Sequence, residues 1–211
     1  NGVEQHARVG VARLREKALT IGFTALLIDL EDAVPGAEKA AAREGALEML
    51  RHAPGACRVR INPLQVSRGF GIGCGREDLA AVVMPGLAGT VAPKIDTAQA
   101  LLEVDAALAE AERAAGLAPH SVPLGATIET ALGSMNVLEI ARAGLQRPVQ
   151  LMFGMGDLTT DLGVEWTRDE AEGTVPRAGY VASDRIDGFV LASEAVSATR
   201  VGQHDVPTGR S

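Results

Sequence analysis

Residues 25–32 read ALLIDLED, and this stretch decides the fold class. Its first part is short and continuously apolar, which is typical of a parallel strand that is buried on both faces. Carboxylates follow at Asp29, Glu31 and Asp32, where such a strand would leave the core. We therefore interpret it as a buried strand with polar chemistry at its carboxyl end.

Four further runs of this kind follow at intervals of about 30 residues, the length of one strand-helix unit. They are residues 57–61 (CRVRI), 90–95 (TVAPKI), 122–128 (VPLGATI) and 149–154 (VQLMFG). Amphipathic patterns between them predict helices over residues 38–50, 98–115 and 136–143. Together these patterns indicate an α/β fold made of repeated strand-helix units.

A helical pattern also precedes the first run. Residues 4–19 carry Val11, Leu14 and Ala18 at helical spacing, and we predict a helix there. We therefore expect a chain that opens on a helix, in the middle of a strand-helix unit.

Every predicted strand ends in side chains that can do chemistry. These are Asp29, Glu31, Asp32, Arg60, Asn62, Lys94, Glu129 and Asp157. In a barrel the carboxyl ends of all strands converge on one site, whereas in an open sheet only those at the switch point do. We therefore predict a (β/α)8 barrel. Residues 1–167 would form its core, and residues 168–211 a divergent C-terminal segment, either a lid or a remnant of the last barrel units.

Composition excludes several other classes. The 211 residues are 46% hydrophobic with a mean hydropathy of +0.11, as in soluble globular proteins. A formal net charge of −7 argues against a nucleic-acid groove or an anionic membrane surface as partner. No apolar stretch is long enough to span a bilayer, and the two cysteines have no metal-ligand spacing. We expect a cytoplasmic protein.

Glu129 and Asp157 are the best candidates for metal ligands. Mg²⁺ takes one or two protein carboxylates and completes its octahedron with water and substrate oxygens. Arg60 lies within an apolar strand, where an unpaired guanidinium would be costly. Its partner would be either a protein carboxylate such as Glu31 or the carboxylate of a substrate.

Five segments resemble, in order and spacing, the citrate lyase beta-subunit-like branch of the HpcH/HpaI aldolase family. They are residues 26–43 (LLIDLEDAVPGAEKAAAR), 59–62 (VRIN), 92–94 (APK), 128–133 (IETALG) and 153–163 (FGMGDLTTDLG). The DLED segment favours the branch that acts on CoA esters over the branch that acts on free hydroxy-oxo acids. The resemblance implies a (β/α)8 barrel that makes or breaks a carbon-carbon bond between an acyl-thioester and a 2-oxo acid, with Mg²⁺.

The resemblance also implies roles for single residues. Glu129 and Asp157 match the metal ligands, and Glu129 is also expected to contact the substrate. Arg60 matches the arginine that binds the carboxylate of the 2-oxo acid. Glu31 and Asp32 match acidic residues that order the water and the side chains around the metal.

Other matched positions concern CoA and a lid. Arg13 and Lys17 match positions that contact the CoA phosphates. Lys39 and Arg43 match a K-x-x-x-R pattern, for which either CoA binding or pairing on the helix surface would account. Asp187, within RIDGFV at residues 185–190, is a catalytic candidate, because this segment could be the remnant of a seventh strand or of a lid that reaches a neighbouring subunit.

Lys94 matches the lysine of a PK pair, as a structural ion pair or as a catalytic group. The family's first strand and last two strand-helix units are not found in the sequence, so we expect an incomplete barrel. The resemblance implies a homo-oligomer, a trimer or hexamer. The substrate could be malyl-, citramalyl- or citryl-CoA or an acyl-carrier-protein ester, with Mg²⁺ or Mn²⁺. Two alternatives stay open: an aldolase on free 4-hydroxy-2-oxo acids, and a truncated non-catalytic homologue that acts as a binding subunit.

Overall fold

A computed structural model describes residues 5–8, 25–66, 71–165, 167, 173, 174 and 176 of the chain. Six strands form one parallel sheet in which neighbours follow the order of the chain. They are β1 (Gln5–Arg8), β2 (Leu26–Asp29), β3 (Cys57–Arg60), β4 (Gly89–Ala92), β5 (Leu124–Ile128) and β6 (Val149–Phe153). Sequential order without a switch point is the arrangement of a barrel wall rather than of a doubly wound sheet.

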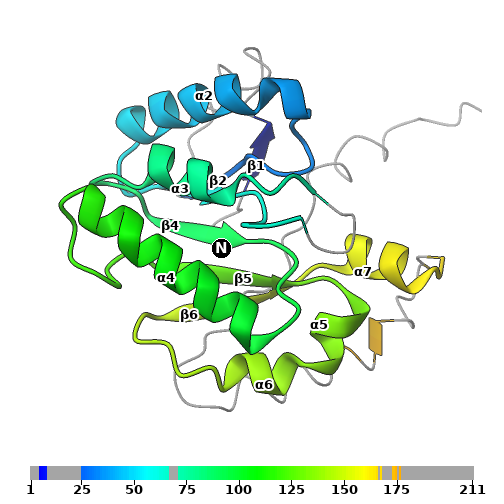
Figure 1. The fold of residues 1–211 in the computed structure, drawn as a ribbon. Helices are drawn as coiled ribbons and strands as arrows, with labels where there is room; N and C mark the ends of the chain where they lie inside the picture. The colour runs from blue at the N-terminus through cyan, green and yellow to red at the C-terminus, as the bar shows by residue number, and fades with distance from the viewer. Residues whose placement is uncertain are drawn as a thin grey trace, which may run out of the picture.

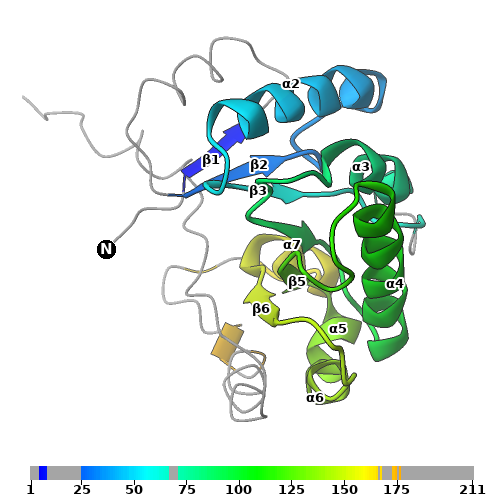
Figure 2. The same cartoon turned by 90° about the vertical axis from the view of Figure 1, so that its left-hand side faces the viewer.

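Helices follow most of the strands and cover one face of the sheet. The helical segments are η1 (Gly36–Glu38), α2 (Lys39–His52), α3 (Gly75–Val82), α4 (Ala98–Ala114), α5 (Ala131–Met135), α6 (Val137–Ala141) and α7 (Met155–Leu162). Figure 1 shows α2, α3 and α4 side by side in front of the strands, and Figure 2 shows this layer from its edge. None of the described helices is both long enough and apolar enough to cross a membrane.

The five strands predicted from apolar runs are confirmed as β2 to β6. The predicted helices over residues 38–50, 98–115 and 136–143 correspond to α2, α4 and α6. Thr97 caps α4 by accepting a hydrogen bond from the backbone N–H of Ala100, and Gly116 ends it with a φ of 73°. The eight-residue helix α3 was not predicted, since two turns are too short to show a clear period.

The prediction of a helix over residues 4–19 is wrong at its start. Residues Gln5–Arg8 form β1, which pairs in parallel with β2 in the register Gln5 to Leu26. The expectation that no strand precedes β2 is therefore also wrong. The reason is that β2 is buried, so the backbone groups along its outer edge need partners, and a strand supplies them where a helix cannot. The rest of residues 4–19 lies outside the described residues.

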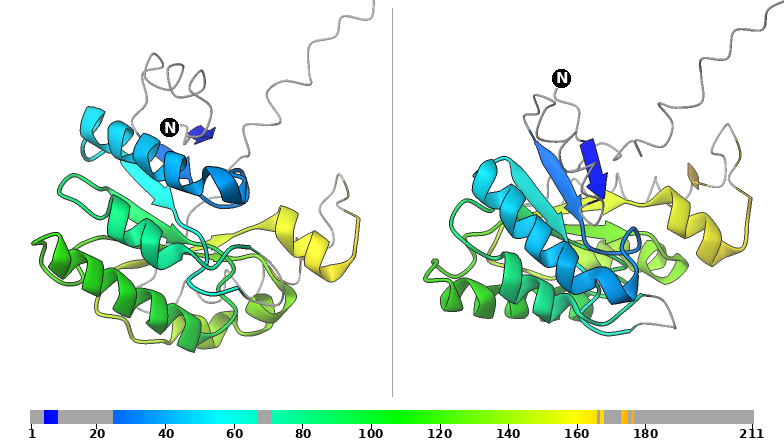
Figure 3. Two further views of the ribbon diagram at one scale, coloured as in Figure 1. Left: turned by 45° about the horizontal axis from the view of Figure 1, so that its top comes forward. Right: turned by 90° about the horizontal axis from the view of Figure 1, so that it is seen from above.

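The two faces of the sheet differ in polarity. The main core lies between the strands and the helices, and includes Ile28, Val59 and Leu108. A smaller cluster of Leu27, Val91 and Met152 lies apart from this core. On β2 the next residue of the same face as Leu27 is Asp29, because side chains alternate along a strand. Figure 3 shows the helical layer on one side of the strands only.

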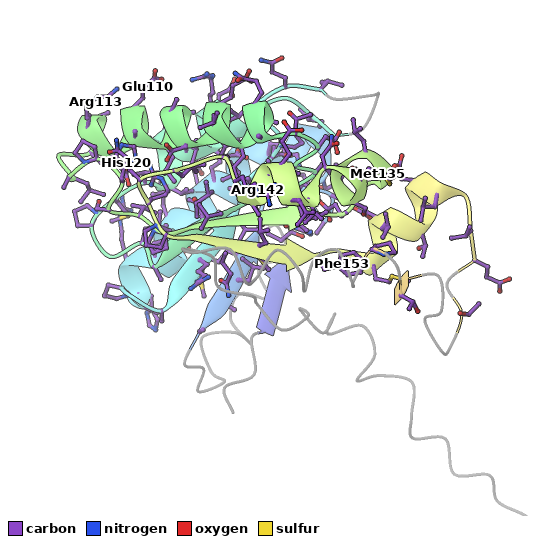
Figure 4. The ribbon with its side chains drawn as sticks, turned by 90° about the horizontal axis from the view of Figure 1, so that it is seen from below. Glu110, Arg113, His120, Met135, Arg142 and Phe153 are labelled. Atoms are coloured by element: carbon purple, nitrogen blue, oxygen red, sulfur yellow. The ribbon has the colours of Figure 1, made fainter. Side chains whose placement is uncertain are left out.

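A buried ionic network lies at the end of the sheet where β5 and β6 begin. We call Arg147, Glu112, Asp105 and His120 the amino-end network, because Arg147 and His120 precede β6 and β5. Arg147 Nη1 and Nη2 donate to the two Glu112 carboxylate oxygens at 2.9 and 3.1 Å, and its Nε donates to Asp105. Glu112 also accepts backbone hydrogen bonds from His120 and Val122, both at 2.7 Å. In Figure 4, His120 lies at the end of the molecule opposite Phe153, where β6 ends.

Candidate active site

Six predicted side chains come together where β2 to β6 end. Figure 1 shows α5 and α7 beginning at this end of the sheet. We call this set the strand-end cluster. Its members are Glu31, Asp32, Arg60, Lys94, Glu129 and Asp157. Convergence at the carboxyl ends of parallel strands is what the barrel prediction required.

Lys94 lies at the centre of the strand-end cluster. Its ammonium donates to Glu31, donates to Asp32 Oδ2 at 2.8 Å, and lies 3.2 Å from Asp157 Oδ2. Its backbone N–H donates to Glu129 Oε1 at 2.8 Å. One residue thus contacts all four carboxylates. It does so with a φ of 52°, a left-handed conformation that costs a non-glycine residue about 1 kcal/mol.

Arg60 has a protein partner. Its Nε and Nη2 bind Asp29 Oδ1 and Oδ2 at 2.9 and 2.6 Å, a bidentate pair, and its Nη1 lies 3.4 Å from Glu31 Oε2. Asp29 and Arg60 face each other in the register of β2 and β3. The prediction that this guanidinium needs an anion is confirmed, and the main anion is Asp29, with Glu31 second.

Two glutamates of the cluster are buried at an electrostatic cost. Glu31 is 1% exposed, and its Oε2 has no hydrogen-bond partner among the described residues. Burial raises the pKa of Glu31, although Arg60 and Lys94 oppose the change. Glu129 is 3% exposed, and burial, with the nearby charges of Glu31 and Asp157, raises its pKa to about 8. The cluster therefore sets four carboxyl groups against two cations, and burial makes the charged forms of Glu31 and Glu129 costly.

These observations fit a divalent cation. Carboxylate oxygens are the hard ligands that Mg²⁺ takes, and Asp157 is close enough for its charge to raise the pKa of Glu129. Glu31 Oε2 accepts no hydrogen bond, although Arg60 Nη1 lies 3.4 Å away, so this oxygen can still take a further positive partner. Among the described residues no three acidic, histidine or cysteine side chains are already gathered as a metal site, so Glu129 and Asp157 would bind with water or substrate completing the shell.

A set of buried polar side chains fixes the backbone around Glu31. Lys39 donates to the carbonyl oxygens of Leu30 and Glu31 at 2.6 and 2.8 Å. Asn62 also donates to the Leu30 carbonyl, at 2.8 Å. The ammonium of Lys39 is therefore bound inside the protein, and pairing on the helix surface does not describe it.

Arg43, the second residue of the K-x-x-x-R pattern, also has an internal partner. Its Nε donates to Asp78 Oδ1 at 2.7 Å. The other oxygen of Asp78 accepts from the backbone and the side chain of Asn62, each at 2.7 Å. Lys39 thus holds the turn that carries Glu31 directly, and Arg43 supports it through Asp78 and Asn62. Asp78 was missed because it lies on the unpredicted helix α3.

Two further features position Glu129. Thr130, which follows Glu129, donates to Asp96. It also caps the start of α5 by accepting a hydrogen bond from the N–H of Gly133. Gly154 is the other feature, because a Cβ there would lie 2.6 Å from both Cβ and Oε2 of Glu129. The sequence offered one signal for Gly154, the FG pair at the end of the last strand.

Three predicted site residues lie outside the described residues: Arg13, Lys17 and Asp187. Contact of Arg13 and Lys17 with CoA and catalysis by Asp187 stay predictions. The proposed boundary at residue 167 also stays a prediction.

The fold and the site define a parallel α/β barrel protein with an acidic site at the carboxyl ends of its strands. A family model described as HpcH/HpaI aldolase/citrate lyase matches residues 10–204. The chain belongs to the HpcH/HpaI aldolase/citrate lyase family.

Two curated relatives are similar over most of the chain. Citrate lyase subunit beta of Escherichia coli strain K12 is 33% identical over 168 residues, 78% of this chain and 53% of that protein. A (3S)-malyl-CoA thioesterase of Cereibacter sphaeroides is 34% identical over 150 residues, 71% of this chain and 47% of that protein. The chain spans about half the length of these relatives.

A solved structure supports the fold. The citrate lyase beta subunit of M. tuberculosis, solved with oxaloacetate and magnesium, superposes with a TM-score of 0.63 at 23% identity, over 90% of this chain and 77% of that one. At this identity the likeness concerns the fold. The predicted barrel class and the predicted family are thereby confirmed.

Proposed function

We propose that the protein is a Mg²⁺-dependent carbon-carbon lyase, or condensing enzyme, that acts on a 3-hydroxyacyl-CoA-type thioester. The products of cleavage would be an acyl-CoA and a 2-oxo acid. The observation that carries the proposal is the carboxylate pair of buried Glu129 and partly exposed Asp157, near Arg60 at the carboxyl ends of the strands. Relatives named for citrate lyase and malyl-CoA chemistry support the thioester class.

The chemistry needs a metal site, a group that binds the carboxylate of the oxo acid and a base for the hydroxyl proton, and the cluster can supply these three. Glu129 and Asp157 would hold Mg²⁺, which when bound stabilises negative charge on the oxygen that becomes the oxo group. Arg60 would bind the carboxylate of the 2-oxo acid through Nη1, because its Nε and Nη2 hold Asp29. The Asp29 pair would fix the plane of the guanidinium, so that the acid enters in one orientation.

Cleavage begins with loss of the proton from the substrate hydroxyl. The oxygen electrons then form the oxo group, the carbon-carbon bond breaks, and its electron pair moves into the thioester as an enolate, which takes up a proton to give the acyl-CoA. We assign the hydroxyl proton to Asp32, whose side chain is 54% exposed and is held by Lys94. Glu31 would hold Lys94 and Arg60 in position through its contacts with both. Asp187 stays a second candidate for accepting the hydroxyl proton.

The CoA ester is favoured over free acids by the DLED segment and by the relatives. The carrier could be CoA or an acyl-carrier protein, and Arg13 and Lys17 are proposed to bind CoA phosphates. We propose a homo-oligomer, because the candidate Asp187 segment would serve a neighbouring subunit's site.

The test is release of a 2-oxo acid from malyl-, citramalyl- and citryl-CoA by the intact chain, with and without Mg²⁺. We expect turnover of at least one ester that requires Mg²⁺ and is lost in Glu129→Gln and Asp157→Asn. Glu139→Gln, which changes an exposed glutamate on α6, is the matched control and should keep activity. Turnover of free 4-hydroxy-2-oxo acids alone would favour the aldolase alternative. Tight binding of the esters without turnover would favour the non-catalytic binding subunit.

A further inference from the structure

Lys94 contacts the same carboxylates that a divalent cation in the strand-end cluster would need. It contacts Glu31, Asp32 and Asp157, while its backbone N–H holds Glu129. Two of these carboxylates, Glu129 and Asp157, are the proposed metal ligands. Lys94 and a divalent cation would therefore share partners.

We propose that Lys94 is the exchangeable cation of this site, a positioning residue that holds the carboxylates together without metal and releases Asp157 when a divalent cation binds. This inference rests on the proposed metal site, but concerns a residue to which that proposal gives no metal role. The contact with Asp157 is the weakest of the three, 3.2 Å against 2.8 Å for Asp32. Glu31 and Asp32 would keep the ammonium when Asp157 turns to the metal.

The geometry shows why a lysine can do this and an arginine is less suited. An ammonium is a compact point charge on a flexible stem, and it can move between partners more easily than a planar guanidinium. Arg60 is locked by two hydrogen bonds to Asp29 and cannot take this part. When Asp157 leaves, the ammonium keeps Glu31 Oε1 and Asp32 Oδ2 as partners.

The backbone supports the same inference. The left-handed φ of Lys94 directs its N–H to Glu129 and its side chain to the other carboxylates. The backbone contact persists whatever the ammonium does, so Glu129 stays in place while Asp157 is released. The backbone of Lys94 thus holds Glu129 in place, while its ammonium occupies Asp157 only until a divalent cation binds.

A direct test uses the low lysine content of the chain. Lysines occur only at positions 17, 39 and 94, so side-chain NMR of protein labelled with ¹⁵N- and ¹³C-lysine should give three assignable signals. On titration with Mg²⁺ we expect the Lys94 signal to shift along the same saturation curve as Mg²⁺ binding measured by calorimetry. The Lys39 signal, bound to backbone carbonyls, should stay in place. A Lys94 signal unmoved at full Mg²⁺ occupancy would overturn the proposal.

The variant Lys94→Met gives an independent readout. It removes a like charge from beside the metal ligands, so Mg²⁺ should bind at least ~10-fold more tightly by calorimetry. In EDTA it should unfold at a lower temperature than wild type, since the carboxylates lose their counter-ion. Arg58→Met, which removes a charge bound to Gln150 instead, is the matched control and should leave the Mg²⁺ affinity unchanged.

The outcomes separate this inference from the proposed function. If wild type binds Mg²⁺ through Glu129 and Lys94→Met binds it equally or more weakly, the exchange is wrong and the metal site stands. If neither wild type nor Lys94→Met binds Mg²⁺, the metal site is wrong and the exchange falls with it.

Discussion

Two buried ionic groups lie at opposite ends of the same barrel wall, and they differ in how well their charges are matched. In the amino-end network the fully buried Arg147 and Glu112 satisfy each other, and backbone groups complete both. Hydrogen bonds from Arg147 and from two backbone N–H groups outweigh burial and lower the pKa of Glu112. The amino-end network stabilises the packing of α4 against the connections that lead into β5 and β6.

The strand-end cluster is left unbalanced. Glu31 Oε2 accepts no hydrogen bond, and burial raises the pKa of Glu129 to about 8. Local mismatch of this kind is common where a ligand completes the site. Both ends bury charged side chains, so burial alone does not indicate a functional site. The strand-end cluster differs from the amino-end network because its carboxyl groups are incompletely paired.

The largest expected effect is on stability at the amino end. Arg147→Met would leave Glu112 buried without its guanidinium, and should lower the free energy of unfolding by about 3–5 kcal/mol in urea. Arg76→Met breaks an exposed pair with Glu110 and should cost less than about 1 kcal/mol. Equal losses in the two variants would remove the structural role assigned to the amino-end network.

The two ends should also respond to pH in opposite senses. The Glu129 carboxyl titrates near 4.5 when unfolded and about 8 when folded, so the metal-free folded state binds an extra proton between these values. Its contribution is present below pH 4.5 and is lost as the pH rises through 8. Glu112 acts oppositely, because its lowered pKa gives stability above pH 4.5 that is lost in acid.

Urea unfolding from pH 3 to 9 in EDTA measures both limbs. Glu129→Gln should abolish the decline above pH 5, and Glu112→Gln should reduce the decline in acid. A decline from pH 5 to 8 of the same size in wild type and in Glu129→Gln would contradict the assignment to Glu129.

A smaller change in stability should separate the site from the scaffold. Gly154→Ala places a Cβ 2.6 Å from Glu129, and we expect it to cost about 1–2 kcal/mol and to abolish stabilisation by Mg²⁺. Gly163→Ala is the control, since this glycine has a φ of 66° and nothing within 4 Å. It should cost about 1 kcal/mol and keep the Mg²⁺ response in thermal unfolding. A full Mg²⁺ response in Gly154→Ala would show that Gly154 does not position Glu129.

The strands β2 to β6 and the end of the barrel that carries the site could be predicted from the sequence, because apolar runs and polar residues after them are local signals. The partner of Arg60 could not, since it depends on the register that sets Asp29 opposite Arg60. The sequence could not decide whether Lys94 forms a structural ion pair or takes part in the chemistry, because its four partners follow three other strands.

The amino-end network was missed, although the sequence carried one sign of it. Asp105 and Glu112 fall on the face of α4 that also carries Leu101 and Leu108, and acids on a buried helix face need buried partners. The partner, Arg147, lies in the connection before β6, where no period predicts its position.

The central claim is that the unbalanced strand-end cluster binds a divalent cation. Titration calorimetry of Mg²⁺ into the metal-free chain at pH 8.5, above the raised pKa of Glu129, tests it most directly. We predict one Mg²⁺ per chain, lost in Glu129→Gln and retained in Glu139→Gln. Binding of equal strength in wild type and Glu129→Gln, or no binding to wild type, would contradict the claim.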